Sequence, residues 1–336
     1  MCTAITWRKY FGRTLDYDHD FAEQVTLTPR RFPMPLRSGE VLEHHYAILG
    51  MARVEEGFPL YFDAFNEKGL CMAGLNFVGN AVYQKPKPQG RNVTSFELIP
   101  WLLGCCATVS QAREALKDVT VTDTPFSDSL PPATIHWLLA DGKEALTLEA
   151  MADGLHIHEN HVGVLTNNPP FPMQLQYLRR FRGISAGEGK DGFAPTLRLE
   201  ADSRGMGALG LPGDLSSQSR FVRAAFTAHN SVCEEDPQAE VSQFFHILGT
   251  VEQTRGCCRV GEGYEVTLYT SCCDTARGVY FYTTYENRSV TAVDIRSCDM
   301  DAATLQCFPL CRTERISCQS DDLPGQSGYV GKFCKK

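Results

Sequence analysis

The second residue of the chain has a side chain that could act as a nucleophile. Cys2 follows the initiator Met1, and its side chain is small enough to permit removal of that methionine. The mature chain would then begin with a thiol and a free α-amine, and an amine with a pKa near ~8 is a competent base at neutral pH. Attack of the thiol on an amide carbonyl would form a thioester that water then hydrolyses. The alternative is a chance cysteine in the first strand, because one residue alone is a weak signal.

Charged and amide side chains elsewhere in the sequence could complete such a site. Arg13 beside the thiol would stabilise a thiolate, and Asp16 near the N-terminal ammonium would orient it, although a surface ion pair is the alternative for both. Asn80 and Asn167 lie in turns flanked by glycine or proline, where asparagine is usually structural but can also donate an N–H to an oxyanion. Arg220 is a further candidate, with a solvated helix arginine as its alternative.

Three hairpin patterns predict the antiparallel sheets that would position these residues. Each pattern consists of two strand-like runs that flank a turn, and the runs are residues 60–65 with 70–77, 135–140 with 144–151, and 265–271 with 279–285. Capping boxes predict helix starts at Thr94 and Thr108. Asp214 opens a third predicted helix, and apolar spacing that ends at Gly249 predicts a fourth. Strands in hairpins and helices in groups favour a layered α+β fold over a regular βαβ alternation.

Length and charge limit the class of protein. The chain has 336 residues, a net charge of −8 and no long basic run, so no nucleic acid is expected as a partner. No linker divides the sequence, and we expect one domain over residues 1–311 followed by a polar tail at 312–336. No run of ~18 apolar residues is present, so we expect no membrane insertion.

The cysteines, 14 in all, are expected to be mostly reduced. The N-terminus lacks a basic segment followed by an apolar one, which argues against export and for a cytoplasmic protein. Neighbours on a strand point to opposite faces and do not readily bridge, so we expect small apolar core residues at pairs such as Cys105-Cys106, Cys257-Cys258 and Cys272-Cys273. His156 and His158 share one face of a strand without further ligands, so we expect no metal site and no cofactor.

Five motifs, taken in order, resemble the choloylglycine hydrolase family of N-terminal-nucleophile enzymes. They are Met1-Cys2-Thr3, Phe-Gly-Arg-x-Leu-Asp at 11–16, Ala-Gly-Leu-Asn-Phe-x-Gly-Asn-Ala at 73–81, Leu-Thr-Asn-Asn-Pro at 165–169 and Leu-Pro-Gly-Asp-x-Ser-Ser-x-Ser-Arg-Phe at 211–221. Five ordered motifs are far more specific than any one of them. The resemblance ends before the C-terminal tail, whose role it leaves open.

The resemblance implies an αββα sandwich, in which two antiparallel sheets lie between helix layers. It also implies an active site that contains the nucleophile and the residues that bind its thiol, its amine and the oxyanion. These residues are Cys2, Arg13, Asp16, Asn80, Asn167 and Arg220. Among these, Cys2 would be the nucleophile and Asn80 the side-chain donor to the oxyanion. A homotetramer is also implied, with residues 187–210 as an arm exchanged between subunits.

The substrate implied by the resemblance is a conjugated bile salt, in which an amide joins a steroid acid to glycine or taurine. Penicillin V acylases of the family tend to have tyrosine at the position of Asn80 and Asn-Ser-Pro where this chain has Asn167-Asn168-Pro169. Both differences favour the bile-salt branch. An acylase that uses the same chemistry on penicillin V or an N-acyl homoserine lactone is the first alternative. A non-enzymatic thiol- or metal-binding protein is the second.

A steroid body requires a mostly apolar pocket with a few placed polar groups. Apolar residues in the motifs and in nearby loop regions could line it, and the candidates are Leu15, Phe21, Phe58, Leu60, Phe126, Leu130 and Ile135. For each of them ordinary core or loop packing is the alternative. Arg13 or another cation could meet the anionic glycine or taurine head.

Overall fold

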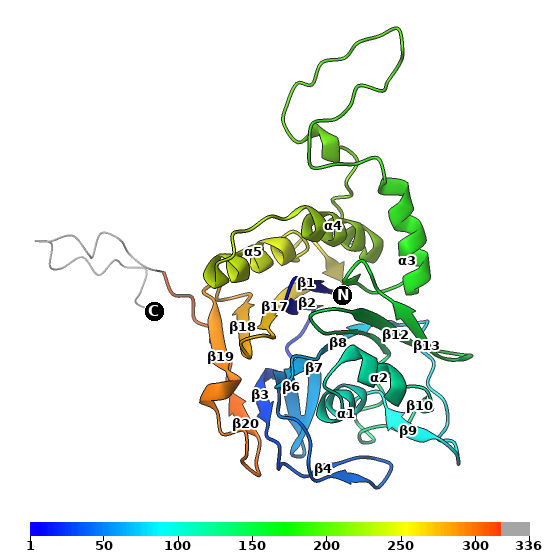
Figure 1. Ribbon diagram of the computed structural model, residues 1–336, viewed down its shortest axis with the longest axis vertical. Coiled ribbons are helices and arrows are strands. Elements are labelled where there is room, and N and C mark those ends of the chain that lie inside the picture. Colours follow the sequence, from blue (N-terminus) through cyan, green and yellow to red (C-terminus); the bar gives the residue numbers. More distant parts are fainter. Residues whose placement is uncertain (317–336) are drawn as a thin grey trace, which may run out of the picture.

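The computed structural model describes residues 1–316, so most of the tail expected at 312–336 lies outside the described residues. The chain forms four layers, in the order helices, six-stranded sheet, eight-stranded sheet, helices (Figure 1). Strands within each of the two large sheets pair antiparallel throughout. The expected αββα sandwich is therefore confirmed.

The six-stranded sheet carries the N-terminus. Its strand order is β14-β1-β2-β17-β18-β19. The strands are β1 (Cys2–Trp7), β2 (Tyr10–Tyr17), β14 (Val164–Leu165), β17 (Val266–Asp274), β18 (Val279–Thr284) and β19 (Thr291–Asp294). Gly12 of β2 permits close packing here, because a Cβ at this position would lie 2.0 Å from the carbonyl oxygen of Ser271 in β17.

The eight-stranded sheet has the order β13-β12-β11-β8-β7-β6-β3-β20. Its strands are β3 (Gln24–Thr28), β6 (Ile48–Glu55), β7 (Phe58–Asn66), β8 (Cys71–Asn76), β11 (Ile135–Ala140), β12 (Ala145–Met151), β13 (Gly154–Glu159) and β20 (Gln306–Phe308). Three two-stranded sheets lie outside the large ones: β4 (Met34–Pro35) with β5 (Val41–Leu42), β9 (Arg91–Thr94) with β10 (Val119–Thr122), and β15 (Arg259–Val260) with β16 (Gly263–Tyr264).

Helices cover the outer face of each large sheet. The helices α4 (Ser217–Asn230) and α5 (Pro237–Gly249) lie on the six-stranded sheet, and α3 (Phe171–Leu178) lies beside α4. The helices α1 (Leu98–Cys105) and α2 (Val109–Ala115) cover the eight-stranded sheet (Figure 1). Short 3-10 turns occur at Arg179–Phe181, Met206–Ala208 and Ile295–Ser297.

Two apolar cores follow from these layers. The inner core includes Cys2, side chains of both sheets and apolar residues of α4 and α5, such as Phe221 and Phe244. The outer core lies between the eight-stranded sheet and the pair α1 and α2, and includes Trp101 and Trp137. Burial on both faces explains why β1 and β2 are almost wholly buried strands.

The three predicted hairpins are confirmed by β7–β8, β11–β12 and β17–β18. Two predicted helix starts are wrong by a few residues. Thr94 ends β9, and α1 begins only at Leu98, although the Glu97 carboxylate accepts the N–H of Thr94 at 3.1 Å as in half of a capping box. Asp214 accepts the N–H of Ser216 at 2.9 Å in a turn that precedes α4. The remaining starts and stops agree, with Thr108 as the N-cap of α2 and Gly249 as the last residue of α5.

The cysteines of residues 1–316 are all free thiols. Cys272 and Cys273 are buried, as expected for core residues. The same expectation is wrong for Cys257-Cys258, because Cys257 is exposed and Cys258 is half-buried in the segment before β15. It is also wrong for Cys105 at the end of α1, which is exposed although Cys106 is buried. No described helix has the length and apolar character needed to cross a bilayer.

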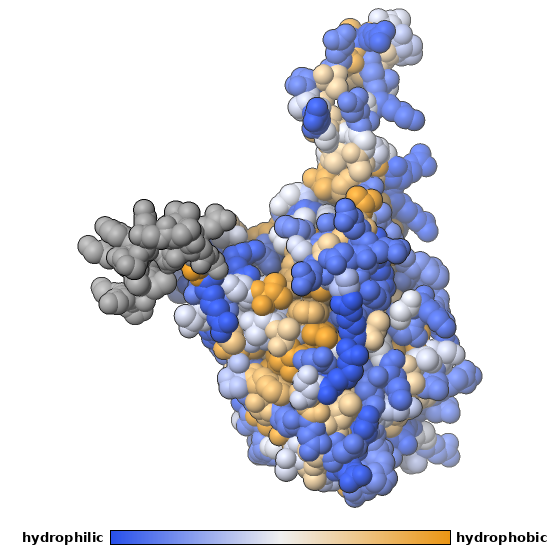
Figure 2. All heavy atoms as spheres, turned by 60° about the vertical axis from the view of Figure 1, so that its left-hand side comes forward, coloured by the Kyte–Doolittle hydropathy of each residue, from blue (hydrophilic) through white to orange (hydrophobic). Residues whose placement is uncertain are grey.

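An arm stands away from the layered body between α3 and α4, and it includes residues 187–210 (Figures 1 and 2). Apolar side chains on it are exposed, with Phe193 at 76% and Leu209 at 78%. At the start of the expected tail, by contrast, Arg312 is bound to the body through ion pairs with Asp20 and Glu23.

Candidate active site

Strand pairing between β1 and β2 divides the candidate residues between two faces. Cys2 lies directly opposite Leu15, and Ala4 opposite Arg13. Directly opposed side chains share a face and neighbours along a strand alternate. The Cys2, Arg13 and Leu15 side chains therefore face the eight-stranded sheet, whereas that of Asp16 faces the helix layer.

Arg13 is fully buried on the same face as the thiol. Its Nη1 donates to the carbonyl oxygens of Phe62 in β7 and Gly74 in β8, whereas Nη2 has no hydrogen-bond partner within residues 1–316. Burial acts to lower the pKa of Arg13, but negative charge nearby, foremost at Cys2, raises it overall. A guanidinium with a free N–H on this face can stabilise a thiolate.

A buried carboxylate that the sequence analysis missed supports Arg13. Asp63 accepts hydrogen bonds from the hydroxyls of Tyr269 at 2.5 Å, Tyr280 at 2.8 Å and Ser271 at 2.9 Å. Burial raises the pKa of Asp63, while the positive charge of Arg13 opposes that rise. The sequence offered one sign of this role, because Asp63 is a charged residue within the apolar run 60–65. A charged residue in a buried strand usually has a partner.

Asp16 is fully buried on the helix-facing side. Its carboxylate accepts the hydroxyls of Thr267 at 2.7 Å and Thr14 at 3.1 Å, and lies 3.9 Å from Arg220 Nη1. Burial raises the pKa of Asp16, and the charge of Arg220 counters this effect. Asp16 is therefore held by protein hydroxyls close to the start of β1.

The main-chain nitrogen of Cys2 is bound by a distant asparagine. It donates to Asn167 Oδ1 at 2.8 Å, and Arg220 Nη2 donates to the same oxygen at 2.7 Å. Arg220 Nη1 also donates to the Cys2 carbonyl oxygen at 2.6 Å. Asn167 Nδ2 donates to the carbonyl oxygen of Asn76 at 2.8 Å. In a chain that begins at Cys2, this nitrogen would be the free α-amine.

Further side chains hold Asn167 in place. Its N–H donates to Ser217 Oγ at 2.9 Å, and its carbonyl oxygen accepts from Gln174 Nε2. The loop is also tied to the eight-stranded sheet, because His136 Nε2 bonds the Thr166 carbonyl oxygen at 2.8 Å. Ser217 was within a quoted motif, but nothing in the sequence distinguished Gln174 or His136.

Glu149 of β12 anchors this loop from the other side. The buried carboxylate bonds His136 Nδ1 at 3.1 Å and accepts the N–H of Phe171, at the start of α3, at 2.8 Å. Burial would raise the pKa of Glu149, but hydrogen bonds from His136 and His158 outweigh burial and lower it to about 2. Glu149 therefore carries a charge that stabilises the chain segment around Asn167.

Asn80 is half-buried and does not bond to Cys2. Its Nδ2 donates to Asn168 Oδ1 at 2.9 Å, and Asn168 Nδ2 donates to the Val78 carbonyl oxygen at 2.7 Å. These bonds join the segment after β8 to the segment that carries Asn167. Asn80 thus contacts the neighbour of the residue that binds the Cys2 nitrogen, and its oxyanion role stays a prediction.

Met1 covers the start of β1. Its ammonium donates to the Asp16 carbonyl oxygen at 2.6 Å and forms an ion pair with the Glu265 carboxylate, while the Asp16 N–H donates to the Met1 carbonyl oxygen at 2.9 Å. Burial lowers the pKa of the Met1 amine. With Met1 attached, Cys2 is only 3% exposed and its nitrogen is an amide. A free Cys2 amine and an accessible thiol, as the sequence analysis expects them, would therefore both require removal of Met1.

The predicted substrate contacts fall into two groups. Leu15 is buried beside Cys2, and Phe21 packs on Tyr17 and Phe62 at the inner core. The others belong to the outer core or pack against it, and they are Phe58, Leu60, Phe126, Leu130 and Ile135. Of the seven predicted contacts, only Leu15 and Phe21 share the core of Cys2, and contact of either group with a substrate stays a prediction.

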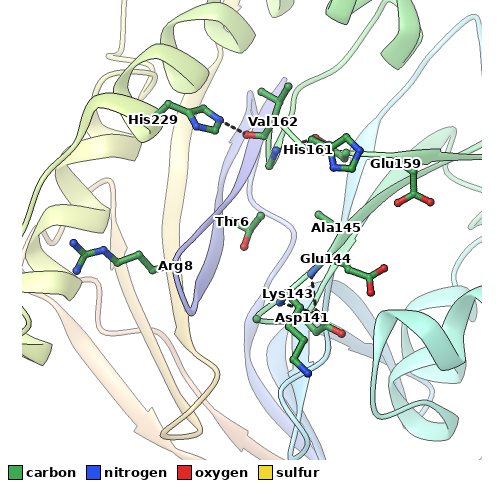
Figure 3. A pocket seen from close by; sticks show the side chains of 13 residues that line it. Thr6, Arg8, Asp141, Lys143, Glu144, Ala145, Glu159, His161, Val162 and His229 are labelled. Atoms are coloured by element: carbon green, nitrogen blue, oxygen red, sulfur yellow. Dashed lines mark hydrogen bonds between the residues drawn. The ribbon is translucent and has the colours of Figure 1, made fainter.

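A cleft of about 390 Å³ lies at the opposite end of β1 from Cys2. Figure 3 shows its mixed polar lining, to which Thr6, Asp141, Lys143 and His161 contribute. None of the six catalytic candidates lines it. A steroid requires a mostly apolar pocket, so this cleft does not fit the expected substrate. Among the described residues, no cluster of three or more His, Cys, Asp or Glu side chains could hold a metal ion.

The four-layer sandwich is the fold of the N-terminal-nucleophile hydrolases. A crystal structure of conjugated bile acid hydrolase from Clostridium perfringens matches 95% of this chain and 100% of its own, with a TM-score of 0.88 and 31% identity. Penicillin V acylase from Agrobacterium tumefaciens has the same fold, with a TM-score of 0.73 at 18% identity over 92% of this chain and 91% of its own.

Residues 2–308 match the family of linear amide C–N hydrolases, choloylglycine hydrolase family. The bile salt hydrolase/transferase of Lactiplantibacillus plantarum is 49% identical over 314 residues, which cover 92% of this chain and 97% of the relative. The bile salt hydrolase/transferase of Clostridium perfringens is 32% identical over 327 residues, which cover 94% of this chain and 99% of the relative. The chain therefore belongs to the choloylglycine hydrolase family, and it is an amidase that acts on linear amides.

Proposed function

We propose that this enzyme hydrolyses the amide bond of glycine- or taurine-conjugated bile salts, with the Cys2 thiol as nucleophile. The observation that carries the mechanism is the hydrogen bond from the Cys2 nitrogen to Asn167 Oδ1, on a residue whose thiol shares a strand face with Arg13. The substrate class is supported by the two bile salt hydrolase/transferase relatives and by the bile-salt pattern at Asn80 and Asn168.

The chemistry begins with removal of Met1. The free amine of Cys2, held by Asn167, takes the thiol proton, and Arg13 stabilises the thiolate. The sulfur attacks the amide carbonyl, and the Asn80 amide donates to the oxyanion that develops. The amine of Cys2 returns the proton to the leaving nitrogen, which departs as free glycine or taurine. Water then cleaves the thioester and releases the bile acid.

The direct test is hydrolysis by protein verified by intact mass to begin at Cys2. With glycocholate and taurocholate, we expect free glycine and taurine to be released. The Cys2→Ser variant and chain that retains Met1 should release neither at a comparable rate. No release by the mature wild-type protein would refute the proposal. Comparison of kcat/KM with penicillin V and an N-acyl homoserine lactone decides between the proposed substrate and the alternatives, because specificity is a ratio of these values.

A second reaction follows from the same intermediate. The names of the two relatives include transferase activity. A thioester at Cys2 can be attacked by an amine instead of water, which would form a new bile acid amide. We include this acyl transfer in the proposed function, and the appearance of a new conjugate when an amino acid is added would test it.

We also propose that the enzyme is a cytoplasmic homotetramer. Exposed free thiols at Cys105, Cys257 and Cys307 suit a reducing compartment. The arm at 187–210 exposes Phe193 and Leu209, and apolar side chains of this kind are suited to contact with a second subunit. Light scattering should give four times the chain mass, and a double Phe193→Ser and Leu209→Ser variant should lower it. A monomeric wild-type protein would contradict this proposal.

A further inference from the structure

His136 contacts both of the chain segments that carry the asparagines of the proposed site. It lies in β11 and is fully buried. Its Nε2 lies 2.8 Å from the carbonyl oxygen of Thr166, the residue before Asn167. Its ring stacks on that of Phe77, with 4.2 Å between the ring centroids and 7° between the ring planes. One buried side chain therefore touches the neighbour of Asn167 and the residue that begins the turn of Asn80.

The turn that carries Asn80 is built on Phe77. The Phe77 carbonyl oxygen accepts the N–H of Asn80 at 3.2 Å and the N–H of Ala81 at 3.0 Å. The side-chain bond from Asn80 to Asn168 joins the same two segments at the surface of the protein. His136 provides a second link between these segments, and this link is buried.

Both ring nitrogens of His136 face oxygens that can only accept hydrogen bonds. Nε2 faces the Thr166 carbonyl oxygen, and Nδ1 lies 3.1 Å from Glu149 Oε1. Burial would raise the pKa of Glu149, but hydrogen bonds from His136 and His158 lower it to about 2, so this group is an ionised carboxylate. A neutral imidazole has only one N–H to donate. The His136 ring can therefore donate to both oxygens only as an imidazolium, whose charge Glu149 compensates.

One further titratable side chain contacts this pair among the residues that the structure describes. His158 Nε2 lies 3.4 Å from the second oxygen of Glu149. Residues 72–81 and 164–176, which include the two asparagine segments, contain no charged side chain. The cation that contacts the loop of Asn167 is Arg220, which donates to Asn167 Oδ1. Loss of either member of the pair of His136 and Glu149 would leave the other as an uncompensated buried charge.

We propose that His136 is a positioning residue of the amidase reaction. As an imidazolium paired with Glu149, it holds the loop of Asn167 and the turn of Asn80 in the relative position that the reaction needs. The inference rests on the proposed function and deepens it, since Asn167 would hold the amine of Cys2 and Asn80 would donate to the oxyanion. Misplacement of reacting groups by ~1 Å can cost a factor of ~100 in rate. A link behind both asparagines therefore matters for the rate, although His136 acts only through its neighbours.

Kinetics of two His136 variants test the positioning role. His136→Phe keeps an aromatic ring for Phe77 and removes both N–H donors. In protein verified by intact mass to begin at Cys2, we expect its kcat for glycocholate to fall ~100-fold. KM should stay within about twofold of wild type, because the two asparagines would act on the reacting atoms. His136→Gln can still donate one N–H to Thr166, so its kcat should be only ~10-fold below wild type.

His45→Phe is the matched control. His45 is also buried and is bonded through both ring nitrogens, to the carbonyl oxygens of Tyr46 at 2.8 Å and Phe32 at 2.9 Å. These bonds lie outside the two asparagine segments, so His45→Phe should lose stability but keep its kcat. A kcat within twofold of wild type in His136→Phe, or equal losses of kcat in the two variants, would overturn the inference. Failure of the proposed function is distinguishable, because mature wild-type protein would then release no glycine from glycocholate.

Nitrogen-15 NMR of histidine-labelled protein tests the ring of His136 without a substrate. Its resonances are those that His136→Phe removes, or those that His136→Gln removes if the phenylalanine variant does not fold. We expect both ring nitrogens to carry a proton at the pH of the activity assay. Glu149→Gln should remove one of these protons, because the compensating charge is lost. A ring nitrogen without a proton in the wild-type protein would overturn the inference, whatever substrate the enzyme hydrolyses.

Discussion

Asn167 Oδ1 accepts the main-chain N–H of Cys2 at 2.8 Å. The two residues come from β1 and from the loop after β14, and this contact is what would hold the nucleophile's amine in the mature chain. Arg220 donates to the same oxygen, so the acceptor has a fixed orientation. In the proposed mechanism, Asn167 would therefore position the base.

Replacement of Asn167 by alanine is expected to lower kcat/KM for glycocholate ~100-fold, because the amine loses its orienting acceptor. The Nη2 of Arg220 would lose its partner as well, so a loss of ~1–3 kcal/mol in the free energy of unfolding should accompany the change. Steady-state kinetics and urea titration measure the two effects. Asn230→Ala at the end of α4 is the matched control, since Asn230 bonds only a helix carbonyl. Activity within twofold of wild type would show that Asn167 does not position the base.

Asp63 and Arg13 are expected to depend on each other for stability. In Asp63→Asn the buried guanidinium would lose one of the negative charges near it, and we expect a loss of ~2–3 kcal/mol in the free energy of unfolding. Tyr280→Phe removes one of the three hydroxyl donors to Asp63 and leaves the charge in place, so it should cost only ~1 kcal/mol. Denaturant titration compares the two. Equal losses in both variants would argue against the charge interaction.

The stabilising effect of Glu149 should depend on pH. Its pKa in the folded chain is about 2, below the ordinary 4.5, so the ionised carboxylate stabilises the fold above pH 4.5 and this contribution disappears as the pH falls toward 2. At pH 7 the free energy of unfolding of the wild type should exceed that of Glu149→Gln by about 3 kcal/mol. The difference should shrink between pH 4.5 and 2. A constant difference across that range would mean that the charge of Glu149 is not responsible.

Alkylation should report the maturation state. Burial raises the pKa values of Cys71, Cys272 and Cys273, so these thiols should react slowly with iodoacetamide. Cys2 should react rapidly in the mature chain and slowly where Met1 is retained, because Met1 covers it. Peptide mass spectrometry measures each site, and the exposed Cys257 serves as an internal reference in both forms. Equal rates at Cys2 in the two forms would contradict the covering role of Met1.

Local patterns in the sequence predicted much of this fold. Turn residues between strand-like runs located the three hairpins, and the five motifs brought together Cys2, Asn167 and Arg220, which the structure joins by hydrogen bonds. The start of α4 was misplaced because Asp214 accepts from Ser216 in a turn, a local bond that competes with a helix N-cap.

The residues that were missed act across long separations in the chain. Asp63 meets Tyr269 and Tyr280 only when the two sheets stack, and Glu265 meets Met1 only when β17 lies near the chain start. The spacing of apolar residues along the sequence indicates local helices and strands, but it does not indicate contacts between distant segments. Substrate contacts were predicted from apolar character alone, which does not distinguish the inner core of Leu15 from the outer core of Phe126.

The short turn at Arg8 and Lys9 between β1 and β2 has a consequence for the evolution of this active site. It fixes which residues of the two strands oppose each other, beginning with Trp7 and Tyr10. One inserted residue that slipped this register would turn Arg13 toward the helices and bring Asp16 into the space between the sheets. The length of this turn thus sets the register of the two strands. The turn should therefore tolerate replacement of its side chains far better than any change in its length.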